Sequence, residues 1–326
     1  MIPSFVNNLF DEPAHKLSGF ALEAFLFQKK QNRVYEQFCE LLPVKKQPVT
    51  RLEDLPFLPI RFFKSHQVVS RASDNFTVFE SSGTTQSIPS RHYVADPFLY
   101  QQSFLKGFER VYGQPQHWCI LGLLPSYLER QHSSLVYMVE HLMQKSDHPL
   151  NGFYLHNHEE LFHALLQLEQ QQQPVLLFGV TFALLDFANR YPAQLRYTTV
   201  IETGGMKGRR EELLREEVHI QLKQQLGLRE VHSEYGMTEL LSQAYSKGNG
   251  LFECPPWMKV LVRQEDDPLS VAQEGKGALN IIDLANSNSC CFLATDDVGE
   301  VYADGTFRVL GRLDNSDVRG CSLLAL

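Results

Sequence analysis

The middle of the chain alternates between short apolar runs and segments in which apolar residues recur every three or four positions. The run Trp118–Leu124 is continuously apolar, as expected for a strand covered on both faces. Strands are predicted at 118–124, 174–180 and 198–202, and helices at 135–143, 159–171, 182–190 and 210–226. Strands that alternate with helices at this spacing predict an α/β fold with a largely parallel sheet.

The two ends of the chain have a different character. Residues 17–42 are predicted to be helical, and prolines between 43 and 59 then break the chain into extended pieces. After Pro255 and Pro256, short β-rich segments alternate with Gly, Asp and Asn turns. These segments are predicted at 257–263, 278–284, 290–295, 299–302 and 306–310. We therefore predict an α/β core over 1–254 and a β-rich subdomain over 255–326.

Composition excludes several classes of protein. The formal net charge of −8 argues against general binding to nucleic acids or anionic membranes, which requires basic clusters. No apolar run approaches the length of a membrane span, and no basic start leads into an apolar N-terminal segment. The six cysteines form neither CxxC pairs nor zinc-finger spacings, so we expect reduced thiols in a cytoplasmic enzyme.

A run of hydroxyl residues, Ser81-Ser82-Gly83-Thr84-Thr85, follows the strand-like segment 76–79. Glycine lets the backbone approach a bulky anion, and hydroxyls together with main-chain N–H groups can bind phosphate oxygens. Such a run is also what ordinary surface turns are made of. Three further motifs follow in order: Tyr235-Gly236-Met237-Thr238-Glu239, Thr295-Asp296-Asp297 and Gly311-Arg312-Leu313-Asp314. Their ordered occurrence favours a nucleotide site over unrelated turns.

These residue types match what the activation of a carboxylic acid by ATP requires. The loop would hold the phosphates with Arg91 close behind as a cation, and the carboxylate of Glu239 would hold a magnesium ion. Tyr235 offers a flat partner for adenine, and Asp297 an acceptor for the ribose hydroxyls. Each residue also has a plainer interpretation: Tyr235 in a turn, Asp297 in a hairpin and Arg312 as a surface cation.

In these motifs the chain resembles the adenylate-forming superfamily of acyl-CoA synthetases and phenylacetate-CoA ligases. The resemblance implies that 81–85 is the phosphate loop, that Tyr235 stacks on adenine and that Glu239 binds magnesium. It implies further nucleotide-binding residues, namely Gly204, Gly205, Gly236, Thr238, Asp297 and Arg312. The implied fold is the N-terminal domain of such enzymes, with parallel-rich sheets flanked by helices and a β-rich subdomain that completes the ribose site.

Three further features narrow the resemblance to the acyl-protein synthetase (LuxE-like) family. They are Pro255-Pro256-Trp257, Leu293–Gly299 and the ending Arg319-Gly320-Cys321-Ser322-Leu323. In that family a fatty acid is adenylated with ATP and Mg²⁺, and the acyl group then passes to a cysteine near the C-terminus. The resemblance implies that Cys321 is this cysteine and that an acceptor protein, a reductase or a carrier protein, receives the acyl group. A thiolate attacks an acyl-adenylate readily, which suits this role.

The chain departs from the superfamily pattern near its C-terminal end. We expect the chain to lack the mobile C-terminal lid domain and its lysine, an expectation that disfavours ligation to coenzyme A. Lys207 follows the Gly204-Gly205 turn and either replaces the lid lysine electrostatically or is a solvated side chain. Two other functions stay open: a lid-less enzyme that hands its acyl-AMP to a carrier-protein thiol, with Cys321 idle, and a catalytically silent scaffold.

Overall fold

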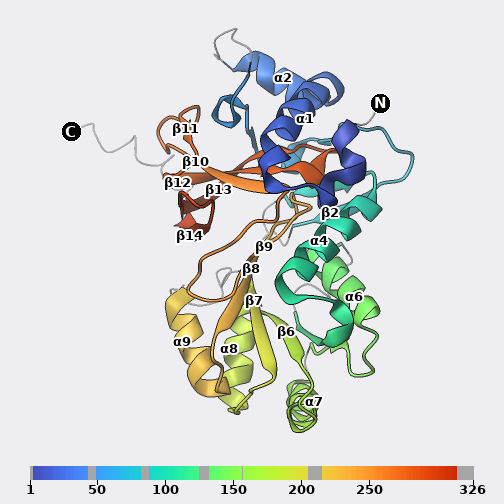
Figure 1. Ribbon diagram of the computed structural model, residues 1–326, viewed down its shortest axis with the longest axis vertical. Coiled ribbons are helices and arrows are strands. Elements are labelled where there is room, and N and C mark those ends of the chain that lie inside the picture. The colour runs from blue at the N-terminus through green and yellow to red at the C-terminus, as the bar shows by residue number, and fades with distance from the viewer. Residues whose placement is uncertain are drawn as a thin grey trace, which may run out of the picture.

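The computed structural model describes residues 3–42, 49–81, 88–124, 132–155, 157–204 and 215–313. These residues form two six-stranded sheets and a separate two-stranded hairpin (Figure 1). The middle of the chain forms one large sheet, and mostly C-terminal strands form the other. None of the helices in the described part of the chain is long and apolar enough to cross a membrane.

The middle sheet has the strand order β5-β4-β6-β7-β8-β9. Its strands are β5 (Gly152–Phe153), β4 (Cys119–Leu123), β6 (Val175–Val180), β7 (Thr198–Thr203), β8 (Val231–Tyr235) and β9 (Ala244–Ser246). Neighbouring strands run parallel except β8 and β9, which are antiparallel. Every residue of β4 and β6 is buried, which explains their continuous apolar runs.

Helices cover both faces of this sheet (Figure 1). One side carries α8 (Thr181–Arg190) and α9 (Arg215–Leu226), and the other carries α4 (Pro97–Tyr112) and α6 (Ser134–Ser146). Helix α7 (His158–Gln170) connects β5 to β6. The helices and strands predicted for this region are confirmed within the described residues. Helix α4 was not predicted from the sequence. Asp96 caps its start, because the Asp96 side chain accepts a hydrogen bond from Phe98 N.

The second sheet has the order β1-β13-β12-β10-β11, with β14 paired to β13. Its strands are β1 (Leu58–Pro59), β10 (Met258–Arg263), β11 (Val271–Ala272), β12 (Gly275–Asp283), β13 (Phe292–Val301) and β14 (Phe307–Arg312). The predicted break between 295 and 299 is wrong, because β13 runs through it. Asp297 does not form a turn there, since it stands opposite Arg312 in the pairing with β14.

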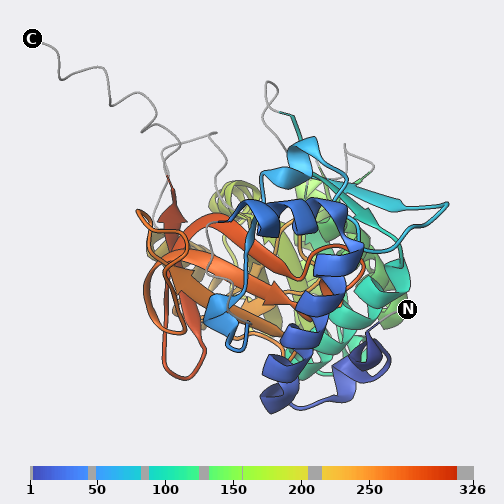
Figure 2. The same cartoon turned by 90° about the horizontal axis from the view of Figure 1, so that it is seen from above.

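The N-terminal helices lie over the second sheet (Figure 2). The predicted helical segment is divided into α1 (Leu17–Gln31) and α2 (Arg33–Leu41). Asn32 separates them because its extended backbone ends α1 and its side chain caps α2 by accepting from Tyr35 N. The rings of Phe25 and Tyr35 contact Phe292 of β13, at 6.4 and 5.9 Å between centroids. The division of the chain at 254/255 stays a prediction.

Shorter elements connect these layers. The separate hairpin consists of β2 (Thr77–Glu80) and β3 (Arg91–Val94), and α3 (Phe62–Ser65) precedes it. The 3₁₀ turns are η1 (Ser4–Asp11), η2 (Ala14–Lys16), η3 (Leu52–Asp54), η4 (Pro115–His117) and η5 (Leu284–Asn286).

Candidate active site

Three side chains from distant parts of the chain meet at one point. Tyr235 ends β8, Asp297 lies in β13 and Arg312 ends β14. The Tyr235 hydroxyl donates to Asp297 Oδ2 at 2.8 Å, and Arg312 Nε donates to Asp297 Oδ1 at 2.9 Å. Because Asp297 stands opposite Arg312 in the β13–β14 register, the strand pairing itself brings this ion pair together.

Glu239 lies within electrostatic reach of the same arginine. Its side chain is buried, and burial raises the pKa of its carboxyl. A hydrogen bond with the Ser90 side chain and the positive charges of Arg312 and Lys64 oppose that rise without cancelling it. The predicted magnesium ligand and the predicted ribose-site arginine therefore belong to one group of interacting charges.

The β2–β3 hairpin holds Ser81, the first residue of the predicted phosphate loop, against Ser90, which lies beside Glu239. Ser81 N donates to the Ser90 carbonyl at 3.0 Å, and Ser90 N donates to Ser81 Oγ at 2.9 Å. The Ser90 side chain that hydrogen-bonds Glu239 thus belongs to the residue that closes the hairpin. Arg91 is 55% exposed at the side chain and donates through Nε to Glu80 Oε1 at 2.9 Å.

The segment after Tyr235 is anchored by the end of the second sheet. Asp283 is the last residue of β12 and is completely buried. Its Oδ2 accepts hydrogen bonds from Leu241 N at 2.8 Å and from Ser242 N at 3.0 Å. Asn286 Nδ2 donates to the carbonyl oxygen of Glu239 at 2.8 Å. The side chains of Asp283, at the end of β12, and of Asn286, in η5, therefore position the backbone that carries Glu239.

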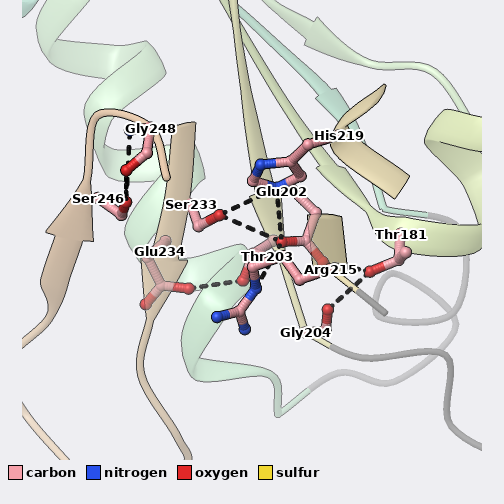
Figure 3. Close-up of polar contacts among 10 residues, drawn as sticks. All are labelled: Thr181, Glu202, Thr203, Gly204, Arg215, His219, Ser233, Glu234, Ser246 and Gly248. Carbon is pink, nitrogen blue, oxygen red and sulfur yellow. Dashed lines mark hydrogen bonds and ion pairs between the residues drawn. The ribbon is translucent and has the colours of Figure 1, made fainter. Parts of the chain in front are cut away.

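The turn after β7 leaves the sheet at the same edge as Tyr235. Thr203 stands opposite Glu234 in the parallel register, so Gly204 and Tyr235 follow neighbouring strand ends. Gly204 has a φ of +72°, which glycine adopts without steric cost. Thr181 Oγ1 lies 2.8 Å from the Gly204 carbonyl oxygen, so the first residue of α8 fixes this turn (Figure 3).

A buried cluster beside this turn contains a serine, a histidine and a glutamate (Figure 3). Glu202 Oε2 lies 3.3 Å from Ser233 Oγ and 3.7 Å from both Arg215 Nε and His219 Nε2. Burial acts to raise the pKa of Glu202, but His219, Arg215 and Thr181 together hold it below the ordinary value. Ser233 and Glu202 both face Nε2 of His219, whereas a catalytic triad needs the acid at the other ring nitrogen. The cluster therefore anchors the end of β7.

The residues of the site fit a magnesium ion that is bound together with phosphates. In the described ranges, no group of three or more His, Cys, Asp or Glu side chains is placed to hold a metal ion by itself. Magnesium commonly takes one or two protein carboxylates and completes its coordination with water and substrate phosphates. Glu239 offers one such carboxylate, which is buried and lies beside Ser90 at the end of the hairpin.

The family model of acyl-protein synthetase, LuxE, matches residues 8–325. The chain belongs to this family. A comparison with curated proteins finds no match.

Solved structures show the fold to which this LuxE-family chain is similar. ATP-bound MatB from Rhodopseudomonas palustris is 15% identical with a TM-score of 0.55, over 75% of this chain and 49% of that chain. A benzoate CoA ligase from Burkholderia xenovorans LB400 is 14% identical with a TM-score of 0.50, over 75% and 50%. The chain thus spans about half the length of these proteins. The predicted fold class, that of the N-terminal domain of adenylate-forming enzymes, is confirmed.

Part of the predicted site lies outside the described residues of this family member. The residues concerned are Ser82, Gly83, Thr84, Thr85, Gly205, Lys207 and Cys321. The structure brings Tyr235, Asp297 and Arg312 into contact and places Glu239 and Ser81 around the same hairpin. The binding roles of all these residues, and of Arg91, Gly204, Gly236 and Thr238, stay predictions.

Three buried polar residues near the site belong to no motif of the sequence. They are His92 in β3, Glu234 in β8 and Asp283 in β12. The sequence contains a signal for Asp283, because an acid that interrupts the apolar run 279–284 needs buried partners. His92 and Glu234 sit beside recognisable motifs, and only the fold shows which way they face.

Replacement of Glu234 by glutamine is expected to stabilise the protein at alkaline pH. Burial raises the pKa of this carboxyl from 4.5 to about 7, and a hydrogen bond from Thr203 at 2.5 Å opposes the rise. Between these values the folded state binds more protons than the unfolded state, so this group lowers the free energy of unfolding as the pH rises. Glutamine cannot ionise, so the Glu234→Gln variant should gain up to about 3 kcal/mol over the wild type across this range.

Urea unfolding of both proteins at about pH 5 and about pH 8 measures this gain. Glu40→Gln is the matched control, because it makes the same chemical change at an exposed position on α2. A Glu234→Gln difference that is the same at both pH values would contradict the raised pKa.

Proposed function

We propose that this chain activates a fatty acid with ATP and Mg²⁺ and passes the acyl group through a thioester on Cys321 to a partner protein. The observation that carries the proposal is the contact of Tyr235, Asp297 and Arg312 beside Glu239. Membership of the acyl-protein synthetase family supports acyl transfer to a protein. The similarity to ATP-bound MatB supports ATP as the activating nucleotide.

Each described residue has a defined task in this proposal. Asp297 accepts hydrogen bonds from the ribose hydroxyls, since a carboxylate that holds one donor on each oxygen retains further acceptor sites. Tyr235 presents its ring to adenine, and Phe252 and Phe307 fix that ring from behind at 5.9 and 5.3 Å. Glu239 holds the magnesium ion, which neutralises phosphate charge when bound.

The proposed reaction has two chemical steps, adenylation of the acid and formation of the thioester. A carboxylate oxygen of the acid bonds to the α-phosphorus of ATP, the bond from that phosphorus to the bridging oxygen breaks, and pyrophosphate leaves with the electron pair. The thiolate of Cys321 then attacks the acyl carbonyl carbon, and AMP leaves as the thioester forms. The proton lost by the thiol passes to solvent.

The other cysteines of the chain are poor candidates for the acylated residue. The structure describes five of them, and all five are free: Cys39, Cys119, Cys254, Cys290 and Cys291. Burial raises the pKa of each thiol, to about 11 for Cys39 and to about 12 for Cys119 and Cys254. The thiolate is the nucleophile, and a raised thiol pKa leaves little thiolate at neutral pH. With these five set aside, Cys321 is the remaining one of the six cysteines in the sequence, which supports it as the acyl acceptor.

Two measurements on the purified full chain test the proposal. Exchange of radiolabelled pyrophosphate into ATP, across a panel of carboxylic acids, measures the first step. Incubation with ATP and a radiolabelled fatty acid measures the second, because a thioester label is released by hydroxylamine. A chain that hands acyl-AMP to a carrier protein would exchange pyrophosphate without labelling itself. A silent scaffold would do neither, and either outcome would refute the proposal.

We further infer that the acyl acceptor is a reductase or a carrier protein and that the reaction takes place in the cytoplasm. The free state of the described cysteines supports a reducing compartment. Mixing the labelled chain with candidate acceptors and following the movement of the label identifies the partner.

A further inference from the structure

His92 connects the hairpin of the predicted phosphate loop to the segment that carries Glu239. It lies in β3, opposite Phe79 in the hairpin register, and its side chain is completely buried. The His92 Nδ1 atom lies 2.8 Å from the carbonyl oxygen of Thr238. The two residues are 146 positions apart in sequence, so this contact joins two otherwise separate parts of the chain.

The chemistry of this contact fixes the state of the imidazole ring. A carbonyl oxygen can only accept a hydrogen bond, so Nδ1 must carry the hydrogen and donate it. Burial lowers the pKa of His92 to about 4, which keeps the ring neutral at physiological pH. Nε2 is then a bare acceptor, and no atom in the described residues pairs with it. Among the described residues, the hydrogen bond to Thr238 is therefore the one that the His92 ring makes.

The hydrogen bond between His92 and Thr238 lies next to Glu239. Ser90, two residues before His92, hydrogen-bonds the Glu239 side chain, and Thr238 is the neighbour of Glu239. The ring of Phe63 contacts His92 edge-on at 5.4 Å and holds it in place. A shift of the hairpin away from Thr238 would separate Ser90, and Ser81 bonded to it, from Glu239.

We propose that His92 is a positioning residue that holds the β2–β3 hairpin against Thr238, so that Ser90, and Ser81 bonded to it, stay beside Glu239 at the nucleotide site. This inference rests on the proposed function of the site. His92 touches neither nucleotide nor metal in this arrangement, and it acts through the backbone of Thr238.

Three substitutions separate the hydrogen bond from the shape of the side chain. His92→Asn keeps a donor near the position of Nδ1, His92→Gln moves the donor one bond farther out, and His92→Phe keeps a ring without a donor. We expect His92→Phe and His92→Gln to raise the KM for ATP about tenfold in pyrophosphate exchange, because they leave a buried carbonyl unpaired. The Mg²⁺ concentration for half-maximal exchange should rise with it. His92→Asn should stay within about threefold of the wild type.

The melting temperature of each variant, with and without ATP and Mg²⁺, distinguishes positioning from general support of the fold. A lower melting temperature of His92→Phe with an unchanged KM for ATP would overturn the inference. So would a His92→Asn variant as impaired as His92→Phe. A wild-type chain that neither exchanges pyrophosphate nor is stabilised by ATP would refute the proposed function, and the role of His92 would fall with it.

Discussion

The Glu239→Gln variant is expected to lose at least about 100-fold in the rate of pyrophosphate exchange. Glutamine keeps the volume of the side chain and removes the negative charge that would bind magnesium. The wild-type carboxylate is buried with a raised pKa, so its replacement by a neutral amide should not lower stability. The loss therefore reports on nucleotide chemistry and is not a consequence of unfolding.

Exchange rates over a magnesium titration, together with the melting temperature, measure this effect. Glu40→Gln is again the matched control, since it makes the same chemical change at an exposed position on α2. Undiminished exchange in Glu239→Gln would refute the magnesium assignment. Recovery of full activity of Glu239→Gln at high Mg²⁺ would instead show that Glu239 contributes only to the affinity for the metal ion.

The Cys321→Ser variant is expected to lose the hydroxylamine-sensitive acyl label completely and to keep pyrophosphate exchange within about threefold of the wild type. The serine hydroxyl is not ionised at neutral pH and is a weak nucleophile without a general base. The residues proposed for adenylation are on other segments of the chain, so the first step should not depend on the thiol.

Cys39→Ser is the matched control for this variant. Cys39 is a half-buried thiol whose pKa burial raises to about 11, and its replacement should leave the label intact. A label that survives Cys321→Ser would show that the thioester forms elsewhere or not at all. Loss of exchange in the same variant would show that Cys321 also supports adenylation.

The hydrophobic pattern was sufficient for the elements that are buried on both faces. Strands β4 and β6 consist wholly of buried residues, so they appear in the sequence as continuous apolar runs. The pattern failed where polar side chains are part of the fold. The sequence predicts Asn32 within a helix, but this residue caps α2. A turn is the plainer interpretation of Asp297, but this residue lies inside β13. Asn32 Nδ2 also donates to the Ser289 carbonyl at 2.9 Å, and Asp297 accepts from Tyr235 and Arg312, and local sequence reveals none of these partners.

The motifs of the candidate site were visible for a related reason. Glycine and hydroxyl residues after a strand, and a Tyr-Gly-x-Thr-Glu element, carry their chemistry in residue type and order. Contacts between motifs were not visible. The bond from His92 to Thr238 and the anchoring of Glu239 by Asn286 depend on strand register and on burial across sheets.

By itself, the sequence determined the alternation of strands and helices, the types of the site residues and their order along the chain. These properties follow from local periodicity and side-chain chemistry, which a single segment contains. Only the tertiary structure decided that Tyr235, Asp297 and Arg312 share hydrogen bonds beside Glu239. Their meeting requires β8, β13 and β14 to converge, and long-range strand pairing is a property of the whole chain that no local pattern encodes.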